Sequence, residues 1–278
     1  MERLRSNYLL IAPSAAIFAA LFIAPFAYFF FLSFWQVKLF KLSADLSTKN
    51  YVEAYDRSAN ILAFTIEMAA IVAVITTALG FVYAYIIRFK AGRWGPALLL
   101  IALVTLFGGY LMKIYAWKTI LGNEGVLNSG LISLGLITEP VTAIFYSPGA
   151  VVVTLVHFLL PFAILPIYAS LRGIDDIELE AARDLGAKPW QTLGGIVIPQ
   201  CKAGIIAAFT FSFLLPAGDY VTPLLVGGKI QLIGNMVRDQ FGKSFNWPLG
   251  SAMAVSILVG ALVVVVMANV LMSLWRPR

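Results

Sequence analysis

Long apolar stretches separated by short polar segments run along the whole chain. A helix needs about 20 residues to cross roughly 30 Å of hydrocarbon, so each apolar stretch of that length is a candidate membrane span. The pattern predicts six transmembrane helices and therefore an all-α integral membrane protein, with one transmembrane domain over residues 1–278. The predicted spans run near residues 8–34, 61–87, 96–116, 148–171, 203–226 and 248–275.

The first stretch begins after Arg3 and Arg5, and therefore has the positive flank of a signal peptide. Its length is about 27 residues, whereas the apolar part of a signal peptide has only about 7–15 residues. We therefore interpret the first stretch as a retained span.

The overall composition agrees with a membrane protein. Hydrophobic residues make up 60% of the chain and charged residues 12%, and the mean hydropathy of +0.88 excludes an ordinary soluble domain. The net charge of +6 does not indicate a nucleic-acid partner, because the basic residues flank apolar stretches, where they orient spans. Cys201 is the single cysteine, which excludes an internal disulfide and a thiolate metal cluster.

The basic residues also predict an orientation. An even number of spans places both termini on one side, and basic residues are densest near the termini and in the turn that holds Arg88, Lys90 and Arg93. Because such residues favour short cytoplasmic segments, we predict cytoplasmic termini and a cytoplasmic segment 172–202. Residues 35–60 and 121–137 are then expected across the outer mouth. The second of these is either an interfacial amphipathic helix or a packed extracytoplasmic cap.

The segment 172–202 has the signals of two short helices. Asp175 and Glu178 have the spacing of a capping box, which predicts a helix start. Ile177, Ala181 and Leu185 follow at helical spacing and give that helix one apolar face.

A glycine and a proline predict where this helix ends and the next begins. Gly186 suits the left-handed position that ends a helix, and Pro189 suits the first turn of a second one. The small side chains of Ala181 and Ala182 allow a partner backbone to approach closely, and the Glu180 carboxylate is suited to a bidentate contact with an arginine. The alternative is an ordinary loop helix that faces water.

The order Glu180-Ala181-Ala182, three residues, Gly186, nine residues, Ile196-Val197-Ile198-Pro199 resembles the cytoplasmic coupling loop of binding-protein-dependent ABC importer permeases. The resemblance extends over residues 60–275 and implies a type I ABC importer permease fold. It also implies that the short helix docks in a cleft of an ATP-hydrolysing subunit. The positions to which it assigns coupling are Glu180, Ala181, Ala182, Gly186, Ile196 and Pro199.

The same resemblance implies the partners and the location. They are a second homologous permease subunit, two copies of a cytoplasmic ABC ATPase, an extracytoplasmic substrate-binding protein and the lipid of the bacterial cytoplasmic (inner) membrane. Gly242-Lys243-Ser244 looks like the end of a phosphate loop, but Val237 stands where that loop needs glycine. ATP and Mg are therefore expected on the ATPase, with no cofactor in this chain.

The sequence offers no candidate catalytic site. His157 is the only histidine, so a metal site with several histidine ligands is not expected. We interpret His157 as a hydrogen-bonded packing residue. No nucleophile-plus-base arrangement is apparent, and we predict that the chain is not an enzyme by itself.

Two acidic residues inside apolar stretches are candidates for a substrate pathway, because ionisable groups in a membrane are costly. Asp219 follows Pro216 and Gly218, which loosen the fifth span, and broken spans occur at transport sites. We predict that Asp219 and Tyr220 lie on the pathway; the alternative is that Asp219 only caps a helix. Glu67 is a further pathway candidate, or else an interfacial residue near the end of its span.

Aromatic residues at the end of the third predicted span are additional candidates. Tyr110 and Trp117 are either pathway residues or part of an interfacial aromatic belt beside a snorkelling Lys113.

The substrate class is suggested by three segments that follow Asp219. The stretches Gly218–Gly228, Ile233–Asn235 and Asn246–Gly250 resemble spermidine/putrescine importer permeases, in particular the first of their two permease subunits. A carboxylate beside aromatic rings also suits a polyammonium ion. Permeases for opines, iron, thiamine or phosphonates are the alternatives, together with an ion-coupled secondary transporter.

Overall fold

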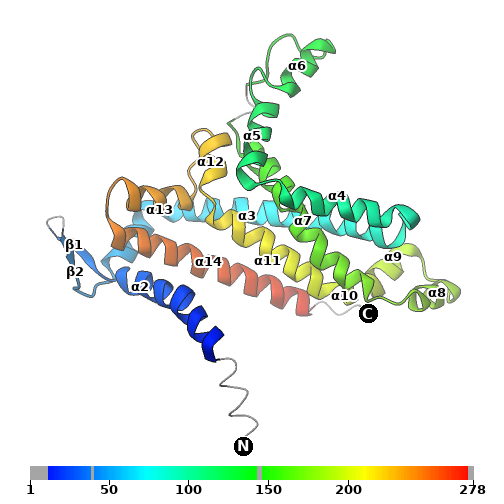
Figure 1. The fold of residues 1–278 in the computed structure, drawn as a ribbon, viewed down its shortest axis with the longest axis horizontal. Helices are drawn as coiled ribbons and strands as arrows, with labels where there is room; N and C mark the ends of the chain where they lie inside the picture. Colours follow the sequence, from blue (N-terminus) through cyan, green and yellow to red (C-terminus); the bar gives the residue numbers. More distant parts are fainter. Residues whose placement is uncertain (1–11, 39–40, 143–145, 275–278) are drawn as a thin grey trace, which may run out of the picture. The chain divides into compact units, whose positions relative to one another are not determined.

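The computed structural model describes residues 12–38, 41–142 and 146–274, and this part of the chain is mostly helical (Figure 1). Two compact units can be distinguished. The first contains residues 1–59 and 236–258, and the second contains residues 60–235 and 259–278. The start of the first predicted span and the end of the sixth lie outside the described residues.

The described helices include enough apolar length for the predicted spans. Four helices are long and apolar enough to cross a membrane, and the number rises to six if each of two bent helix pairs counts as one span. The single helices are Ala12–Leu32, Lys49–Phe89, Pro148–Arg172 and Trp247–Leu274, and the pairs are Gly92–Phe107 with Tyr110–Ser133 and Pro189–Gln200 with Lys202–Gly218.

The first unit begins with an apolar helix that ends in η1 (Ala19–Ile23) and α2 (Ala24–Leu32). A short antiparallel hairpin follows, formed by β1 (Gln36–Lys38) and β2 (Lys41–Ser43). The unit also contains the first turns of α3 (Lys49–Phe89), the end of α13 (Ile233–Gly242) and the first half of α14 (Trp247–Leu274).

The segment 35–60 therefore differs from the polar loop that hydropathy indicates. Its second half is helical from Lys49 onward. The buried side chain of Asn50 holds the start of α3 in place. The Asn50 side-chain amide donates to the carbonyl oxygens of Ser33 at 2.8 Å and Trp35 at 2.6 Å. Both carbonyl groups follow the last residue of α2, Leu32, where the helix no longer supplies a backbone donor.

The second unit contains most of the remaining helices. They are η2 (Gly92–Trp94), α4 (Gly95–Phe107), α5 (Tyr110–Leu121), α6 (Val126–Ser133), α7 (Pro148–Arg172), α8 (Asp176–Asp184), α9 (Pro189–Thr192), η3 (Leu193–Val197), α10 (Ile198–Gln200), α11 (Lys202–Gly218) and α12 (Val221–Val226). The helix α6 lies within the segment 121–137, where the sequence predicts an amphipathic helix or a packed cap.

The helix α7 is the centre of the second unit and packs against α4, α5, α11 and α12. In Figure 1 it lies beside α11. Ser147 caps its start by accepting a hydrogen bond from Ala150 N at 3.1 Å. The contact with α11 is close because Gly204 has no side chain: a Cβ atom there would lie 2.5 Å from the Pro166 carbonyl oxygen. Small residues of this kind allow membrane helices to approach.

The third predicted span is two helices rather than one straight helix. The chain bends by 97° between Gly92–Phe107 and Tyr110–Ser133. Gly108 and Gly109 occupy the break, and the backbone of Gly108 is extended. Two consecutive glycines have low helix propensity, and a hydropathy average over about 20 residues does not register them.

Cys201 occupies the second bend, between α10 and α11. It is fully buried, and its thiol contacts the Ile167 carbonyl oxygen of α7 at 3.6 Å. The joint between the two bent helices is therefore packed against the central helix.

Candidate functional site

The segment between α7 and α11 forms the predicted pair of short helices. Asp175 caps α8, because its Oδ1 accepts a hydrogen bond from Ile177 N at 3.0 Å. The other contact of the predicted capping box, from the Glu178 side chain back to the start of the helix, is wrong. Glu178 instead accepts a hydrogen bond from the Gln200 side chain. A partner from α10 has replaced the local backbone partner, and sequence spacing alone does not reveal it.

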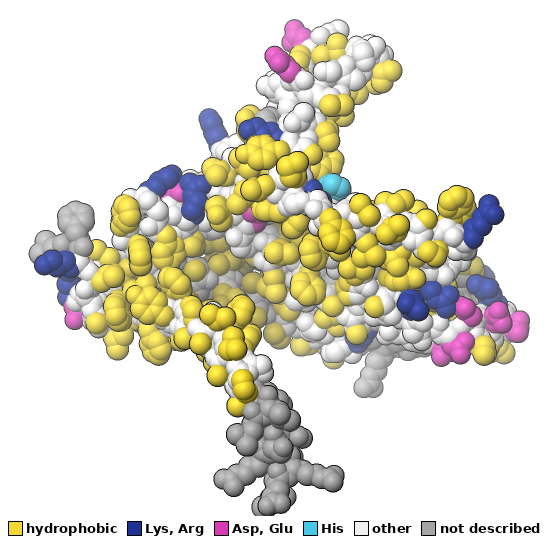
Figure 2. Space-filling model, viewed as in Figure 1, with side chains coloured by type: hydrophobic (Ala, Val, Ile, Leu, Met, Phe, Trp, Pro, Cys, Tyr) yellow, Lys and Arg dark blue, Asp and Glu magenta, His cyan; other side chains and the backbone are white. Residues whose placement is uncertain are grey.

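The predicted apolar face of α8 points away from the rest of the chain. Ile177 is 70% exposed and Leu185 is 89% exposed, whereas Leu179 is the buried residue of this helix. Figure 2 shows acidic and basic side chains gathered around the same helix. A short helix that presents both apolar and charged side chains to the outside is suited to a protein partner.

The turn after α8 has the geometry that its sequence predicts. Gly186 has φ +82°, which is the left-handed region that favours glycine. The Ala187 amide closes the turn by donating to the Ala182 carbonyl at 2.9 Å, and α9 begins at Pro189. Glu180 and Ala181 are exposed, while Ile196 and Pro199 are partly buried in the following helical turns.

A second candidate site surrounds the break between α11 and α12. Asp219 Oδ1 accepts hydrogen bonds from Val221 N at 2.9 Å and Thr222 N at 3.3 Å, so Asp219 does cap α12. The Tyr110 hydroxyl from α5 donates to the same oxygen at 2.6 Å and lies 2.8 Å from Thr222 Oγ1. The other carboxylate oxygen, Oδ2, is buried and has no hydrogen-bond partner among the described residues.

A cavity of about 470 Å³ opens at this carboxylate. Its walls come from α5, α7, α11 and the break before α12, and they are mainly apolar and aromatic. The ring of Phe158 lies 4.8 Å from that of Tyr110, measured between centroids. The lining residues are Tyr110, Leu155, Phe158, Leu214, Leu215, Gly218, Asp219, Tyr220 and Val221.

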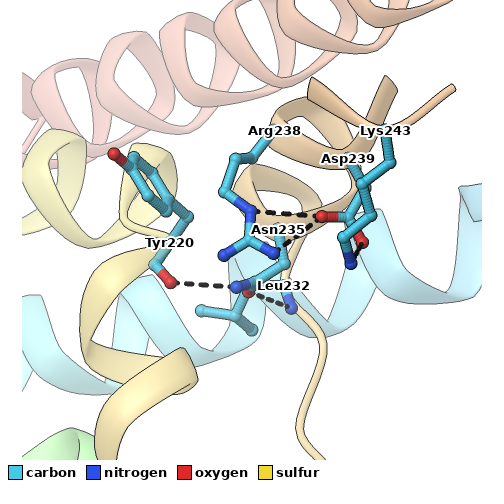
Figure 3. Close-up of polar contacts among 6 residues, drawn as sticks. All are labelled: Tyr220, Leu232, Asn235, Arg238, Asp239 and Lys243. Atoms are coloured by element: carbon cyan, nitrogen blue, oxygen red, sulfur yellow. Dashed lines mark hydrogen bonds and ion pairs between the residues drawn. The ribbon is translucent and has the colours of Figure 1, made fainter. Parts of the chain in front are cut away.

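Three of the five predicted pathway residues, Tyr110, Asp219 and Tyr220, thus line one cavity. The carbonyl oxygen of Tyr220 accepts a hydrogen bond from Asn235 Nδ2 at 2.9 Å, and Asn235 Oδ1 accepts one from Leu232 N (Figure 3). These contacts hold the break between α11 and α12 in place.

The other two predicted pathway residues do not line this cavity. Glu67 is exposed on α3, and Trp117 lies two turns beyond Tyr110 on α5. The indole of Trp117 donates to His157 Nδ1 at 3.1 Å. His157 is therefore hydrogen-bonded as predicted, but its position is exposed rather than packed.

The position of Lys113 contradicts the alternative that this residue is a snorkelling lysine. Lys113 is only 7% exposed, and its ammonium group lies 5.3 Å from the centroid of the Phe158 ring. A snorkelling lysine would place its ammonium in water. Instead, Nζ is buried without a hydrogen-bond partner in the described part of the chain.

Phe158 and Thr222 complete this site but were not identified from the sequence. Phe158 is one of many aromatic residues in apolar stretches, and its position carries no distinguishing signal. Thr222 follows Asp219 by three residues, a spacing typical of a cap and the amide that it binds.

No family model matches the chain. It is 35% identical to the spermidine/putrescine transport system permease protein PotB of Haemophilus influenzae over 217 residues, which cover 77% of this chain and 75% of that protein. The PotB protein of Escherichia coli K12 is 36% identical over 78% of this chain and 76% of its own length. The chain belongs to the ABC importer permeases.

The permease is also similar to the inner membrane ABC transporter permease protein YdcU of E. coli K12, with 34% identity over 69% of this chain and 65% of that protein. Its fold matches a crystal structure of a bacterial ABC transporter involved in the import of the acidic polysaccharide alginate. The TM-score is 0.75 and the match covers 98% of the permease and 96% of that chain, at 15% identity. The permease therefore has the all-α membrane fold of ABC importer permeases and is a multi-pass membrane protein.

Proposed function

We propose that the permease is one of two membrane subunits of an ATP-driven importer for a polyammonium ion such as spermidine or putrescine. The observation that carries this proposal is the Asp219 carboxylate at an aromatic-lined cavity, where its Oδ2 is buried without a hydrogen-bond partner among the described residues. The two PotB relatives, which are named as spermidine/putrescine transport permeases, support the same substrate class.

The chemistry of the cavity suits an ammonium group. Asp219 Oδ2 supplies an anionic acceptor to which no group in the described part of the chain donates a hydrogen bond. The rings of Tyr110, Phe158 and Tyr220 supply faces for cation–π contacts, which contribute about 0.5–2 kcal/mol each. One ammonium group at Asp219 would leave the methylene chain of a polyamine against the apolar walls.

Coupling to ATP hydrolysis is proposed at α8. Its exposed Ile177 and Leu185 would enter a groove of the ATPase subunit, and the exposed Glu180 carboxylate would pair with an arginine there. ATP and Mg would be bound by two copies of that ATPase. Closure of the ATPase dimer would move α8, open the pathway outward and let a docked binding protein deliver the substrate; hydrolysis would then reset the permease.

The proposed setting is the bacterial inner membrane with both termini in the cytoplasm. This orientation places α8 and α9 on the side where ATP is present. A second, homologous permease would complete the pathway, and a substrate-binding protein would dock on the opposite side.

Lys113 favours a second candidate substrate. Its buried ammonium group lies at the Phe158 ring that lines the cavity, and has no anionic partner among the described residues. A solute that carries an anionic group as well as an ammonium group, such as an aminophosphonate, would supply one.

The test is reconstitution of the permease with its cognate ATPase, second permease and binding protein in proteoliposomes. We expect spermidine or putrescine on the binding protein to stimulate ATP hydrolysis, and Glu180→Lys to abolish the stimulation. Stimulation by 2-aminoethylphosphonate alone would replace the polyamine by the second candidate. A permease that binds no ATPase would overturn the importer assignment.

A further inference from the structure

The first turn of α8 is attached to the end of α3, although the two lie far apart in the sequence. Arg88 Nη2 donates to Asp176 Oδ1 at 2.9 Å and to the Ile174 carbonyl oxygen at 3.1 Å. One guanidinium group therefore contacts both the first residue of α8 and the backbone that leads into it.

The Arg88 side chain is held in this position by its surroundings. It is 22% exposed, and its guanidinium lies 4.8 Å from the centroid of the Phe89 ring. Ile174 is buried, so the carbonyl contact lies at the edge of the core. A planar guanidinium that is stacked and shared between two acceptors loses little freedom for each bond.

Stability alone is a weak explanation of this ion pair. Asp176 is 63% exposed, and exposed pairs contribute little to folding. What the contact does provide is a direct mechanical connection between two helices.

The two ends of α8 differ in their attachments. At the first turn Arg88 binds Asp176, and Gln200 of α10 binds Glu178. Among the described residues, no side-chain hydrogen bond or ion pair joins residues 180–186 to another element. This second half ends at Gly186, whose left-handed backbone separates it from α9.

We infer that Arg88 is a positioning residue that transmits a displacement of α8 to α3. The inference rests on the proposed docking of an ATPase on α8. A push on the exposed Leu185 end would rotate α8 about its attached first turn, and the Arg88 contacts would carry that motion into α3. Gln200 would carry it into α10 and α11 in the same way.

The test compares Arg88→Gln with a matched control, Arg93→Gln, in the reconstituted complex. Arg93 lies in η2, five residues further on, and stacks on Trp94 at 5.6 Å. It has no ion pair among the described residues. Two quantities are measured for each variant: the ATPase that copurifies, and the stimulation of ATP hydrolysis by loaded binding protein.

We expect Arg88→Gln to keep ATPase binding within about twofold of the wild type. Stimulation should fall by about fivefold or more, because allosteric couplings are typically of that size. Arg93→Gln should change neither quantity. Asp176→Asn should reproduce the loss, and the double variant should be no worse than either single variant.

Three results would overturn the inference. One is stimulation of Arg88→Gln at the wild-type level. Another is loss of ATPase binding in that variant, which would mean that Arg88 only maintains the shape of α8. Additive losses in the double variant would also contradict it, because they would show that the two side chains act separately. Failure of the wild-type complex to bind an ATPase would instead refute the proposed function.

Discussion

Replacement of Asp219 by asparagine removes one charge from the cavity and leaves the shape of the side chain nearly unchanged. The asparagine Oδ1 can still accept hydrogen bonds from Val221 N, Thr222 N and the Tyr110 hydroxyl, which all bind Oδ1 of the aspartate. Oδ2, which is buried and has no hydrogen-bond partner among the described residues, becomes an amide NH₂ group. An acceptor on a residue that lines the cavity thus becomes a donor, while the cap of α12 remains.

The size of the expected effect follows from the kind of bond that is lost. A hydrogen bond to a charged group contributes about 1.5–3 kcal/mol, which corresponds to a factor of about 10 to 150 in affinity at 25 °C. We therefore expect uptake of spermidine at subsaturating concentration to fall by about one to two orders of magnitude. Asp219→Ala should in addition lose the cap and destabilise the fold by about 1 kcal/mol.

The assay is uptake of labelled spermidine by proteoliposomes that contain the complete complex. Asp239→Asn is the matched control, because Asp239 pairs with Arg238 and Lys243 and does not line the cavity (Figure 3). Uptake by Asp219→Asn within about twofold of the wild type would refute the pathway role and leave Asp219 as a cap alone.

Three further predictions concern stability. Gly204→Ala should destabilise the detergent-solubilised permease by about 1–3 kcal/mol in thermal unfolding, because the new Cβ would meet two oxygen atoms of α7 at 2.5 Å. Gly194→Ala is the control and should have no such effect, because a Cβ atom at Gly194 would have no neighbouring atom within 4 Å in the described part of the chain. Asp175→Ala should lower the helicity of a peptide that contains α8, since it removes a cap worth about 1 kcal/mol, and unchanged circular dichroism would contradict this. The hydrogen bond from Lys243, and to a smaller extent that from Arg238, lowers the pKa of Asp239 in the folded protein. The ionised carboxylate therefore stabilises the fold above the unfolded-state pKa of about 3.9, and this stabilisation is lost as the pH falls through the lower pKa of the folded state. The difference in melting temperature between wild type and Asp239→Asn should therefore be larger at pH 7 than at pH 3, and a constant difference would refute it.

Hydropathy located the long apolar helices of this chain but not their interruptions. The predicted range 148–171 is nearly the same as α7, because Pro148 and the polar end at Arg172 border a continuous apolar stretch. The pair Gly108–Gly109 breaks the third region, but two residues scarcely change an average over a whole span. The polarity of residues 49–60 predicts a loop because it indicates contact with water, but a helix also allows that contact.

The candidate sites were predictable where they depend on local sequence. Asp219 and Tyr220 follow Pro216 and Gly218, so the sequence indicates both the break in the helix and the acidic residue beside it. The contact of Tyr110 with Asp219 joins positions 109 residues apart, and that of Arg88 with Asp176 joins positions 88 apart. Such pairs depend on how α5 and α3 pack, and no local pattern specifies that packing.

The position of Cys201 gives the permease a built-in reporter of its own movement. It is the only thiol in the chain, and it is buried where α10 and α11 meet against α7. A maleimide can reach it only when α11 separates from α7, so the labelling rate measures how often the contact between these two helices opens. Cysteines introduced at exposed positions would react without interference from this slow background, which makes the natural sequence ready for distance measurements during the transport cycle.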